Sequence, residues 1–413
     1  MARVLYVTIP AEGHVNPTLG LVKQLVDNGE EVVYMCSEEY RDRLAQTGAQ
    51  FRAYQLDEQV FRELGFNPTE FKHPLHFTDF MLRGIIEPRI PEILRQIENE
   101  SFDYVIFDSL FGWGGAILAE KLGIPTICSV TNLAFAEPLS HIVEVFDASD
   151  VDVDVEALYE RVTQTAQSIA RVCNIAVPAI EDITRQYGHM KIVFTSREFQ
   201  PDADKLDDSY IFTGPSITSR PDSPSFPFEK LRSQYDKVVY ISMGSILTKD
   251  VEFYKLCFAA FQDIPAQFVL SCGKDTELEA LGERIPPNFI VEPYVPQLEV
   301  LQLADAFITH AGMNSTSEAL YFHVPLVMIP LSSDQPIVAK RVEELGAGIM
   351  LDRGQLTPTA LKDALLQVLN ECTYKERAMQ VGDSLRNAGG YQEAARRIMS
   401  LYSKKENAGT PHS

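Results

Sequence analysis

Two polar residues that each follow an apolar stretch could perform acid–base chemistry. His14 follows the first expected strand, and Asp108 follows the apolar run 104–107. Asn16 is a favoured helix N-cap and Pro17 a favoured first helical residue, so we expect His14 to lie in the turn before a helix. The positive end of that helix disfavours imidazolium, so His14 could act as a general base with Asp108 as its partner. Alternatively, His14 only occupies a turn and Asp108 only caps a helix.

A second candidate site follows the apolar run 306–309. His310 precedes small and hydroxyl-bearing residues at 311–317, where a helical pattern begins. Free backbone N–H groups and the dipole at a helix N-terminus bind anions such as phosphate, and His310 could donate a further hydrogen bond. The loop 242–245 has a similar composition. Either loop could instead be an ordinary capped turn.

Short β-branched runs alternate with amphipathic helical patterns, which is typical of parallel sheets with crossover helices. Residues 213–227 interrupt this alternation with four prolines and several serines, which predicts a linker. We therefore predict two doubly wound α/β domains whose loops face a cleft, because ligands of such folds bind at the carboxyl ends of strands. The expected strands are 4–9, 31–36, 104–107, 126–130, 192–195, 238–243, 268–271, 289–291, 306–309 and 326–329, and the expected helices are 17–28, 114–121, 251–261, 315–321, 339–345, 358–370 and 393–403.

The charge of the chain limits its partners. Its 413 residues include 36 basic and 58 acidic side chains, a formal charge of −22. Such a chain repels nucleic acid and anionic membranes. The same charge disfavours an anionic small substrate, unless local dipoles and donors such as those after His310 hold it. A hydrophobic content of 45% and a charged content of 23% exclude disorder and coiled coil.

Several common chemistries lack their sequence motifs. The six cysteines show no metal-binding or disulfide spacing, so we expect buried, reduced thiols. Dinucleotide-binding, P-loop, zinc-protease and α/β-hydrolase motifs are missing from the sequence. His73 and His76 could suggest a metal pair, but no carboxylates surround them, so a loop is expected there. No apolar stretch has the length of a signal peptide core or a membrane span, which predicts a cytoplasmic protein.

Four segments of the second half resemble the donor-binding signature of UDP-glycosyltransferases. They are 294–297, 309–319, 324–326 and 334–335, and they follow the order and spacing of that family. The segment 13–17, Gly-His-Val-Asn-Pro, is similar to the family's catalytic-histidine loop. On these motifs the chain is identified as a member of glycosyltransferase family 1, similar to the bacterial macrolide and flavonoid glycosyltransferases of the YjiC type.

The resemblance implies the GT-B fold, an α/β architecture of two Rossmann-like, doubly wound domains that face a cleft. Residues 1–212 would form the acceptor-binding domain and 237–385 the UDP-sugar donor-binding domain. A linker would span 213–236. Residues 386–413 would form a C-terminal helix that packs back on the N-terminal domain, and a tail.

The resemblance also implies an inverting transfer of glucose from UDP-glucose to a hydroxyl group, without an essential metal or another cofactor. His14 would deprotonate the acceptor hydroxyl and Asp108 would assist it. Tyr294 would stack on the uracil, Gln297 would flank the base or ribose, and Glu318 would accept hydrogen bonds from the ribose. The other donor-binding residues that the resemblance implies are Gly244, Ser245, Val295, His310, Gly312, Asn314 and Ser315 around the nucleotide, and Asp334 and Gln335 at the sugar.

Two departures from the family pattern bear on the donor. Tyr294 stands where many relatives have tryptophan, so it covers less of the base. Met313 stands where the plant signature has a tryptophan that frames the sugar, which leaves the selectivity for glucose open.

Two rival functions are a UDP-sugar epimerase on the same fold and a non-catalytic nucleotide-sugar-binding protein.

Aromatic residues of the N-terminal half predict a wide apolar acceptor pocket. Such a pocket would suit small lipophilic phenols and alcohols, such as flavonoids and macrolides. The alternative is that most of these side chains belong to the core. The candidate pocket residues are Phe66, Phe77, Phe80, Met81, Phe111, Trp113 and Phe135.

We expect the protein to be a monomer or a weak dimer.

Overall fold

The chain folds into two compact units. The computed structural model describes residues 1–54, 73–138, 153–218, 220, 224–244, 250–274, 276–282 and 285–408, with side chains up to 401. Unit 1 comprises Met1–Thr218 and Ala388–Ser413, and unit 2 comprises Ser219–Asn387. The C-terminal segment therefore belongs to the unit formed by the N-terminal half.

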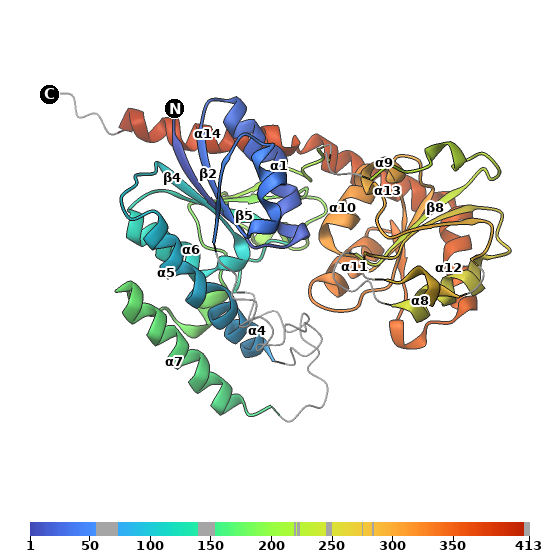
Figure 1. The fold of residues 1–413 in the computed structure, drawn as a ribbon, viewed down its shortest axis with the longest axis horizontal. Helices are drawn as coiled ribbons and strands as arrows, with labels where there is room; N and C mark the ends of the chain where they lie inside the picture. Colours follow the sequence, from blue (N-terminus) through green and yellow to red (C-terminus); the bar gives the residue numbers. More distant parts are fainter. Residues whose placement is uncertain are drawn as a thin grey trace. The chain divides into compact units, whose positions relative to one another are not determined.

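Unit 1 is built on a seven-stranded parallel sheet in the order β3-β2-β1-β4-β5-β6-β7 (Figure 1). The middle strands are buried on both faces, which explains why they form nearly continuous apolar runs in the sequence. The sequence did not predict β3 and β7, because these edge strands are short and only partly buried. The strands are β1 Arg3–Val7, β2 Glu31–Cys36, β3 Gln50–Ala53, β4 Tyr104–Asp108, β5 Thr126–Val130, β6 Met190–Val193 and β7 Tyr210–Phe212.

Helices cover both faces of this sheet. Helices α1 and α14 share one hydrophobic core with it and lie side by side in Figure 1. The other face is covered by α5 and α6 together with a π-helical segment, Met81–Ile86, and α7 packs against α4, α5 and this segment. The helices are α1 Glu12–Asp27, α2 Arg41–Ala45, α4 Pro74–Phe80, α5 Glu87–Gln96, α6 Trp113–Leu122, α7 Val155–Cys173 and α14 Gly390–Ala408.

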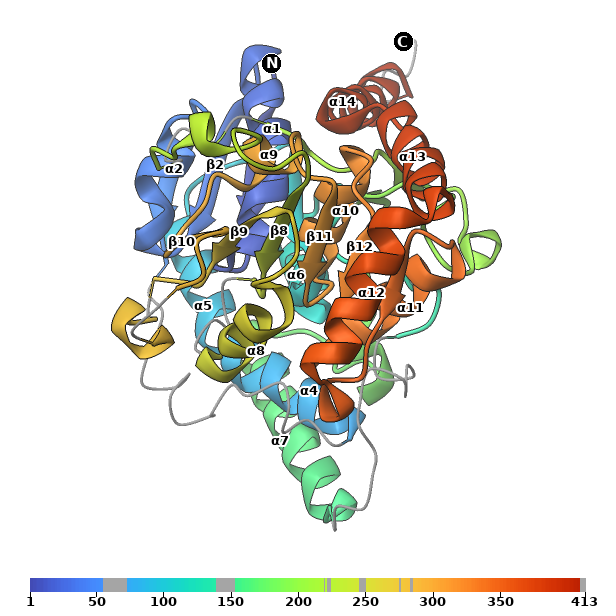
Figure 2. The ribbon, with the colours of Figure 1, turned by 90° about the vertical axis from the view of Figure 1, so that its right-hand side faces the viewer.

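Unit 2 contains a six-stranded parallel sheet in the order β10-β9-β8-β11-β12-β13. Helices α8 and α12 pack on one face, where they lie in front of the strands in Figure 2. Helix α10 packs against α13. The elements are β8 Val238–Ser242, α8 Val251–Phe261, β9 Gln267–Ser271, β10 Phe289–Glu292, α9 Gln297–Leu301, β11 Ala306–Thr309, α10 Met313–Tyr321, β12 Leu326–Met328, α11 Gln335–Glu344, β13 Gly348–Met350, α12 Pro358–Asn370 and α13 Cys372–Asn387.

The expected start of the first helix is wrong. Helix α1 begins at Glu12, so His14 lies in its first turn and Pro17 lies inside the helix. The carbonyl of Ala11 accepts from the backbone N–H groups of both His14 and Val15, at 2.9 Å each, which starts the helix one turn earlier. Pro17 removes one helical hydrogen bond, but this loss does not outweigh the burial of the helix on the sheet.

Two smaller expectations are also wrong. The nitrogen Nδ1 of His73 accepts from the backbone N–H of Leu75 at 3.2 Å, so His73 caps α4 and His76 lies within that helix rather than in a loop. Histidine is not among the residues favoured at a helix N-cap, so the sequence around His73 did not indicate the start of α4. Five cysteines are buried free thiols, but Cys372 is exposed because it begins α13 at the surface.

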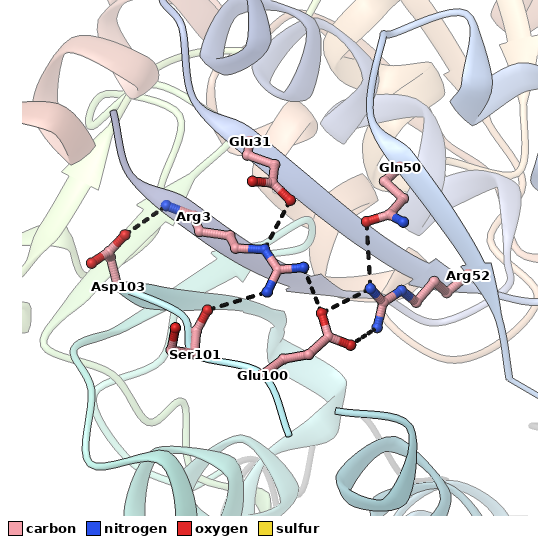
Figure 3. A network of polar contacts seen from close by, with 7 residues as sticks. All are labelled: Arg3, Glu31, Gln50, Arg52, Glu100, Ser101 and Asp103. Carbon is pink, nitrogen blue, oxygen red and sulfur yellow. Dashed lines mark hydrogen bonds and ion pairs between the residues drawn. The ribbon is translucent and has the colours of Figure 1, made fainter. Parts of the chain in front are cut away.

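A network of charged side chains links strands β1, β2 and β3 of unit 1 to the segment before β4 (Figure 3). Arg3 at the start of β1 donates to Glu31 at 2.8 Å and to Glu100 at 2.5 Å. Arg52 of β3 also pairs with Glu100, with a second contact at 2.9 Å. The backbone N–H of Arg3 donates to Asp103 at 2.6 Å. Glu100 therefore links β1 to β3, and its hydrogen bonds to Arg52 and Arg3 lower its pKa to about 2.

Replacing Glu100 by glutamine should lower the free energy of unfolding at pH 7 by about 1 kcal/mol. The effect is small because the ion pairs of Glu100 with Arg3 and Arg52 are only partly shielded from solvent. The unfolded pKa of glutamate is about 4.3. The folded value is about 2, so the contribution is complete above the unfolded value and is lost as the pH falls toward 2. Urea unfolding of wild type and Glu100→Gln at pH 7 and pH 2.5 measures this difference. Glu38→Gln, which removes one exposed pair with Arg41, serves as the control. A deficit of equal size at both pH values would contradict this role.

Candidate active site

A histidine and a carboxylate meet at the carboxyl edge of the sheet in unit 1. The nitrogen Nδ1 of His14 lies 2.7 Å from Oδ2 of Asp108. Asp108 ends β4, the neighbour of β1, and its side chain is fully buried. Its other oxygen, Oδ1, accepts from the backbone N–H of Leu110 at 2.8 Å. Asp108 therefore contacts His14 and also caps the short 3₁₀ turn Ser109–Phe111. It does not cap the following helix α6, whose N-cap is Gly112, so that alternative is wrong.

A third residue, which the sequence analysis did not single out, contacts the same ring nitrogen. The hydroxyl of Thr131, directly after β5, lies 3.0 Å from Nδ1 of His14 and is 1% exposed. The carboxylate of Asp108 accepts hydrogen bonds, so Nδ1 carries the proton and Nε2 presents a lone pair. The hydroxyl of Thr131 is then a second acceptor for that proton. Strands β1, β4 and β5 are adjacent, so the first turn of α1, which follows β1, brings His14 beside the ends of β4 and β5.

The structure divides the candidate acceptor residues into two groups. Phe80, Met81, Phe111 and Trp113 are buried and belong to the hydrophobic core of unit 1. Phe77 and Phe135 are partly exposed, and these two remain candidates for contact with a ligand. Phe66 lies outside the described residues.

In unit 2, His310 occupies a narrow space between two glycines. It follows β11 and precedes Gly312, the N-cap of α10. A Cβ atom at Gly244 would lie 2.7 Å from Nε2 of His310, and one at Gly312 would lie 2.5 Å from it. Burial lowers the pKa of His310 to about 4, so the ring is neutral at pH 7 and carries one N–H donor. Ser245 lies outside the described residues.

The first turn of α10 leaves backbone N–H groups at the carboxyl end of the sheet. Gly312, Asn314 and Ser315 are partly exposed there. Helix α10 has nine residues, so its dipole supports an anion at this end. This arrangement can bind a phosphate group.

Glu318, in the second turn of α10, is held from two sides. The amide of Gln297 donates to Oε2 of Glu318 at 2.6 Å and to the hydroxyl of Ser315 at 3.3 Å. The hydroxyl of Tyr240 donates to Oε1 of Gln297 at 3.3 Å. The amide of Gln297 is therefore engaged within the protein, and it orients Glu318 and Ser315.

The second contact of Glu318 comes from a segment that the sequence identified only as linker. Arg220 forms an ion pair with Oε1 of Glu318, and the two side chains are 16% and 7% exposed. No sequence signal identified Arg220, because a Pro- and Ser-rich stretch does not reveal the partner of one of its side chains.

Tyr294 is positioned to stack on a planar ligand. Its side chain is 37% exposed after β10, and Nζ of Lys274 lies 5.4 Å from its ring centroid. The next residue, Val295, is 2% exposed, so its side chain packs inward. The ring of Tyr294 can therefore stack on a base, while Val295 anchors the loop.

The adjacent pair Asp334 and Gln335 lies at the start of α11. Asp334 is the N-cap of this helix and is partly exposed. Oε1 of Gln335 accepts from the backbone N–H of Leu331 at 2.9 Å and of Ser332 at 3.3 Å. Both acceptor positions of this oxygen are occupied, so the side chain of Gln335 has only its amide N–H groups left for a ligand.

The described residues contain neither a metal-binding cluster nor a membrane-spanning helix. Within the described ranges, no three His, Cys, Asp or Glu side chains gather in a group that could hold a metal ion. No helix in the described part of the chain has the length and apolar character to span a membrane.

Comparison with known proteins agrees with this architecture. The family described as "UDP-glucoronosyl and UDP-glucosyl transferase" matches residues 220–386. The chain is 36% identical to the uncharacterized UDP-glucosyltransferase YojK of Bacillus subtilis, over 98% of both chains. It is 32% identical to the NDP-glycosyltransferase YjiC of the same organism, over 96% of this chain and 97% of the relative.

A solved structure supports the same assignment. The glycotransferase of kitacinnamycin aligns with a TM-score of 0.80 and 27% identity, over 96% of this chain and 98% of that one. The chain therefore belongs to the UDP-glycosyltransferases of glycosyltransferase family 1, of the YjiC type, and it is an enzyme with the GT-B fold that transfers a glycosyl group from a nucleotide sugar.

Proposed function

We propose that the enzyme transfers glucose from UDP-glucose to a hydroxyl group of a small lipophilic acceptor, with inversion at the anomeric carbon. The observation that carries this proposal is the 2.7 Å contact between His14 and the buried Asp108. A base with a fixed tautomer suits the deprotonation of an alcohol or phenol. Flavonoids, macrolides and other phenols or alcohols are the acceptor class, and Phe77 and Phe135 are the partly exposed aromatics that could contact them.

In this proposal, Nε2 of His14 removes the proton from the acceptor hydroxyl. The acceptor oxygen then forms a bond to the anomeric carbon of glucose, while the bond from that carbon to the diphosphate breaks and UDP leaves. Asp108 stabilises the imidazolium that results. A single direct displacement inverts the anomeric centre, and it requires neither a carboxylate nucleophile nor an essential metal.

The donor would be bound by residues of unit 2. The neutral His310 and the N-terminus of α10 would stabilise the negative charge that develops on the leaving diphosphate. Tyr294 would stack on the uracil and Glu318 would accept from the ribose. Asp334 and Gln335 would hold the hydroxyls of the sugar.

Replacing His14 by alanine should lower turnover by roughly 10²–10⁴-fold, because the general base is lost. Wild type incubated with UDP-glucose and a flavonol should form a glucoside and UDP, detected by mass spectrometry, and NMR should show a β-linkage. Binding of UDP to His14→Ala, measured by calorimetry, should stay near wild type. His189→Ala, an exposed histidine of the same unit, should retain turnover. Full turnover by His14→Ala would exclude this base.

Replacing Gly312 by alanine should raise the KM for UDP-glucose by about tenfold, which corresponds to about 1.4 kcal/mol. The backbone of Gly312, with φ −61° and ψ 142°, accepts alanine, so the obstacle is the new Cβ atom 2.5 Å from His310. Gly354→Ala is the control, because its Cβ would meet no atom closer than 3.4 Å. Steady-state kinetics with varied donor measure both variants. An unchanged donor KM in Gly312→Ala would remove His310 from the donor site.

Replacing Gln335 by glutamate should lower kcat/KM for UDP-glucose by about tenfold or more while UDP affinity stays the same. One carboxylate oxygen can still accept from Leu331 and Ser332, but the atom left for the sugar then accepts instead of donating. Gln367→Glu adds the same charge at an exposed position of α12 and serves as the control. Wild-type kinetics of Gln335→Glu would show that its amide does not donate to the sugar.

A further inference from the structure

Glu318 poses an electrostatic problem for a site that receives a diphosphate. The residue is 5% exposed, so its charge is poorly solvated. Glu318 lies five positions after Met313, the first residue of α10, which is a rise of about 7.5 Å along the helix axis. This distance is within one Debye length at physiological ionic strength, which is about 8 Å. A bound diphosphate would therefore be repelled by Glu318 if this charge had no counter-ion.

The structure supplies a counter-ion from the segment before the sheet of unit 2. Arg220 pairs with Oε1 of Glu318, and both side chains are largely buried. Gln297 donates to the other oxygen at 2.6 Å, but a neutral amide only orients the carboxylate and does not balance its charge. Arginine keeps its charge at every accessible pH and is less strongly hydrated than lysine, so it suits a partly buried pair.

We propose that Arg220 is a positioning residue of the donor site, which neutralises Glu318 so that the site accepts the diphosphate. This inference rests on the proposed function, in which Glu318 accepts hydrogen bonds from the ribose. The ion pair leaves the carboxylate further lone pairs for ribose hydroxyls. It also removes most of the repulsion between Glu318 and an anion at the N-terminus of α10.

A competing role makes the opposite prediction. If Arg220 only occupied the position of the ribose, its removal would free Glu318 and strengthen nucleotide binding. If Arg220 only oriented Glu318, its removal would weaken uridine and UDP equally, because orientation matters to the ribose in both ligands. Only if Arg220 neutralises the charge of Glu318 should its removal weaken the binding of UDP more than the binding of uridine.

The test compares Arg220→Met, Glu318→Gln and the double variant by calorimetry with UDP and with uridine. Arg220→Met should weaken the binding of UDP by about tenfold and the binding of uridine by at most threefold. The double variant should bind UDP no more weakly than Glu318→Gln alone, since no unpaired carboxylate remains. Arg220→Lys should recover part of the loss. Arg232→Met is the matched control. It also removes an arginine–carboxylate ion pair, but this pair, with Asp305, lies at the amino ends of β8 and β11 and not at the carboxyl end of the sheet.

Three outcomes would overturn the proposal: UDP binding by Arg220→Met at or above wild type, equal losses for UDP and uridine, or additive losses in the double variant. Thermal unfolding and circular dichroism of each variant separate these outcomes from misfolding, and Arg220→Lys keeps the test available if Arg220→Met is unstable. Failure of the proposed function is distinguishable, because Glu318→Gln would then leave both UDP and uridine binding unchanged.

Discussion

The complete burial of Asp108 is the constraint on which the site of unit 1 depends. A buried carboxylate is stable only when its oxygens are hydrogen-bonded or paired. Asp108 meets this condition through His14 on one oxygen and the backbone of Leu110 on the other. The same bond that satisfies Asp108 fixes the tautomer of His14, and Thr131 adds a second acceptor at the same nitrogen. The same hydrogen bond thus stabilises the buried carboxylate of Asp108 and orients the ring of His14.

The topology of the sheet makes this arrangement possible. Strands β1, β4 and β5 are neighbours, although they are far apart in the sequence, and their carboxyl ends lie at one edge. Away from that edge, Glu100 binds both Arg3 at the start of β1 and Arg52 of β3, and it thereby links these two strands. The two places use carboxylates differently. The network around Glu100 is more solvated and holds strands together, whereas the carboxyl edge buries one carboxylate beside a base.

The parts of this fold that depend on local pattern could be predicted, and the parts that depend on distant contacts could not. Strands β2, β5 and β11 begin and end at the predicted residues, because burial on both faces makes them apolar runs. Edge strand β3 was missed because it is short and half-exposed. The start of α1 was misplaced, since Asn16 and Pro17 match the local rules for a helix start but packing on the sheet extends the helix beyond them. His14 and Asp108 could be found from their places after strands. Arg220 could not, because it lies in a Pro- and Ser-rich stretch with no strand or helix pattern that would place its side chain beside Glu318.

The net charge of −22 and the proposed affinity for a diphosphate are compatible because they act over different distances. Charges beyond about 8 Å are largely screened at physiological ionic strength, so the distant acidic groups have little effect on one bound ligand. The total charge instead governs the approach of large partners such as nucleic acid or membranes. A single diphosphate responds to the groups around it, which in the proposed site would be the neutral His310, the N-terminus of α10 and a carboxylate already paired with Arg220. An acidic protein can therefore bind an anion without a cluster of basic residues, provided that the nearest acid has its own counter-ion.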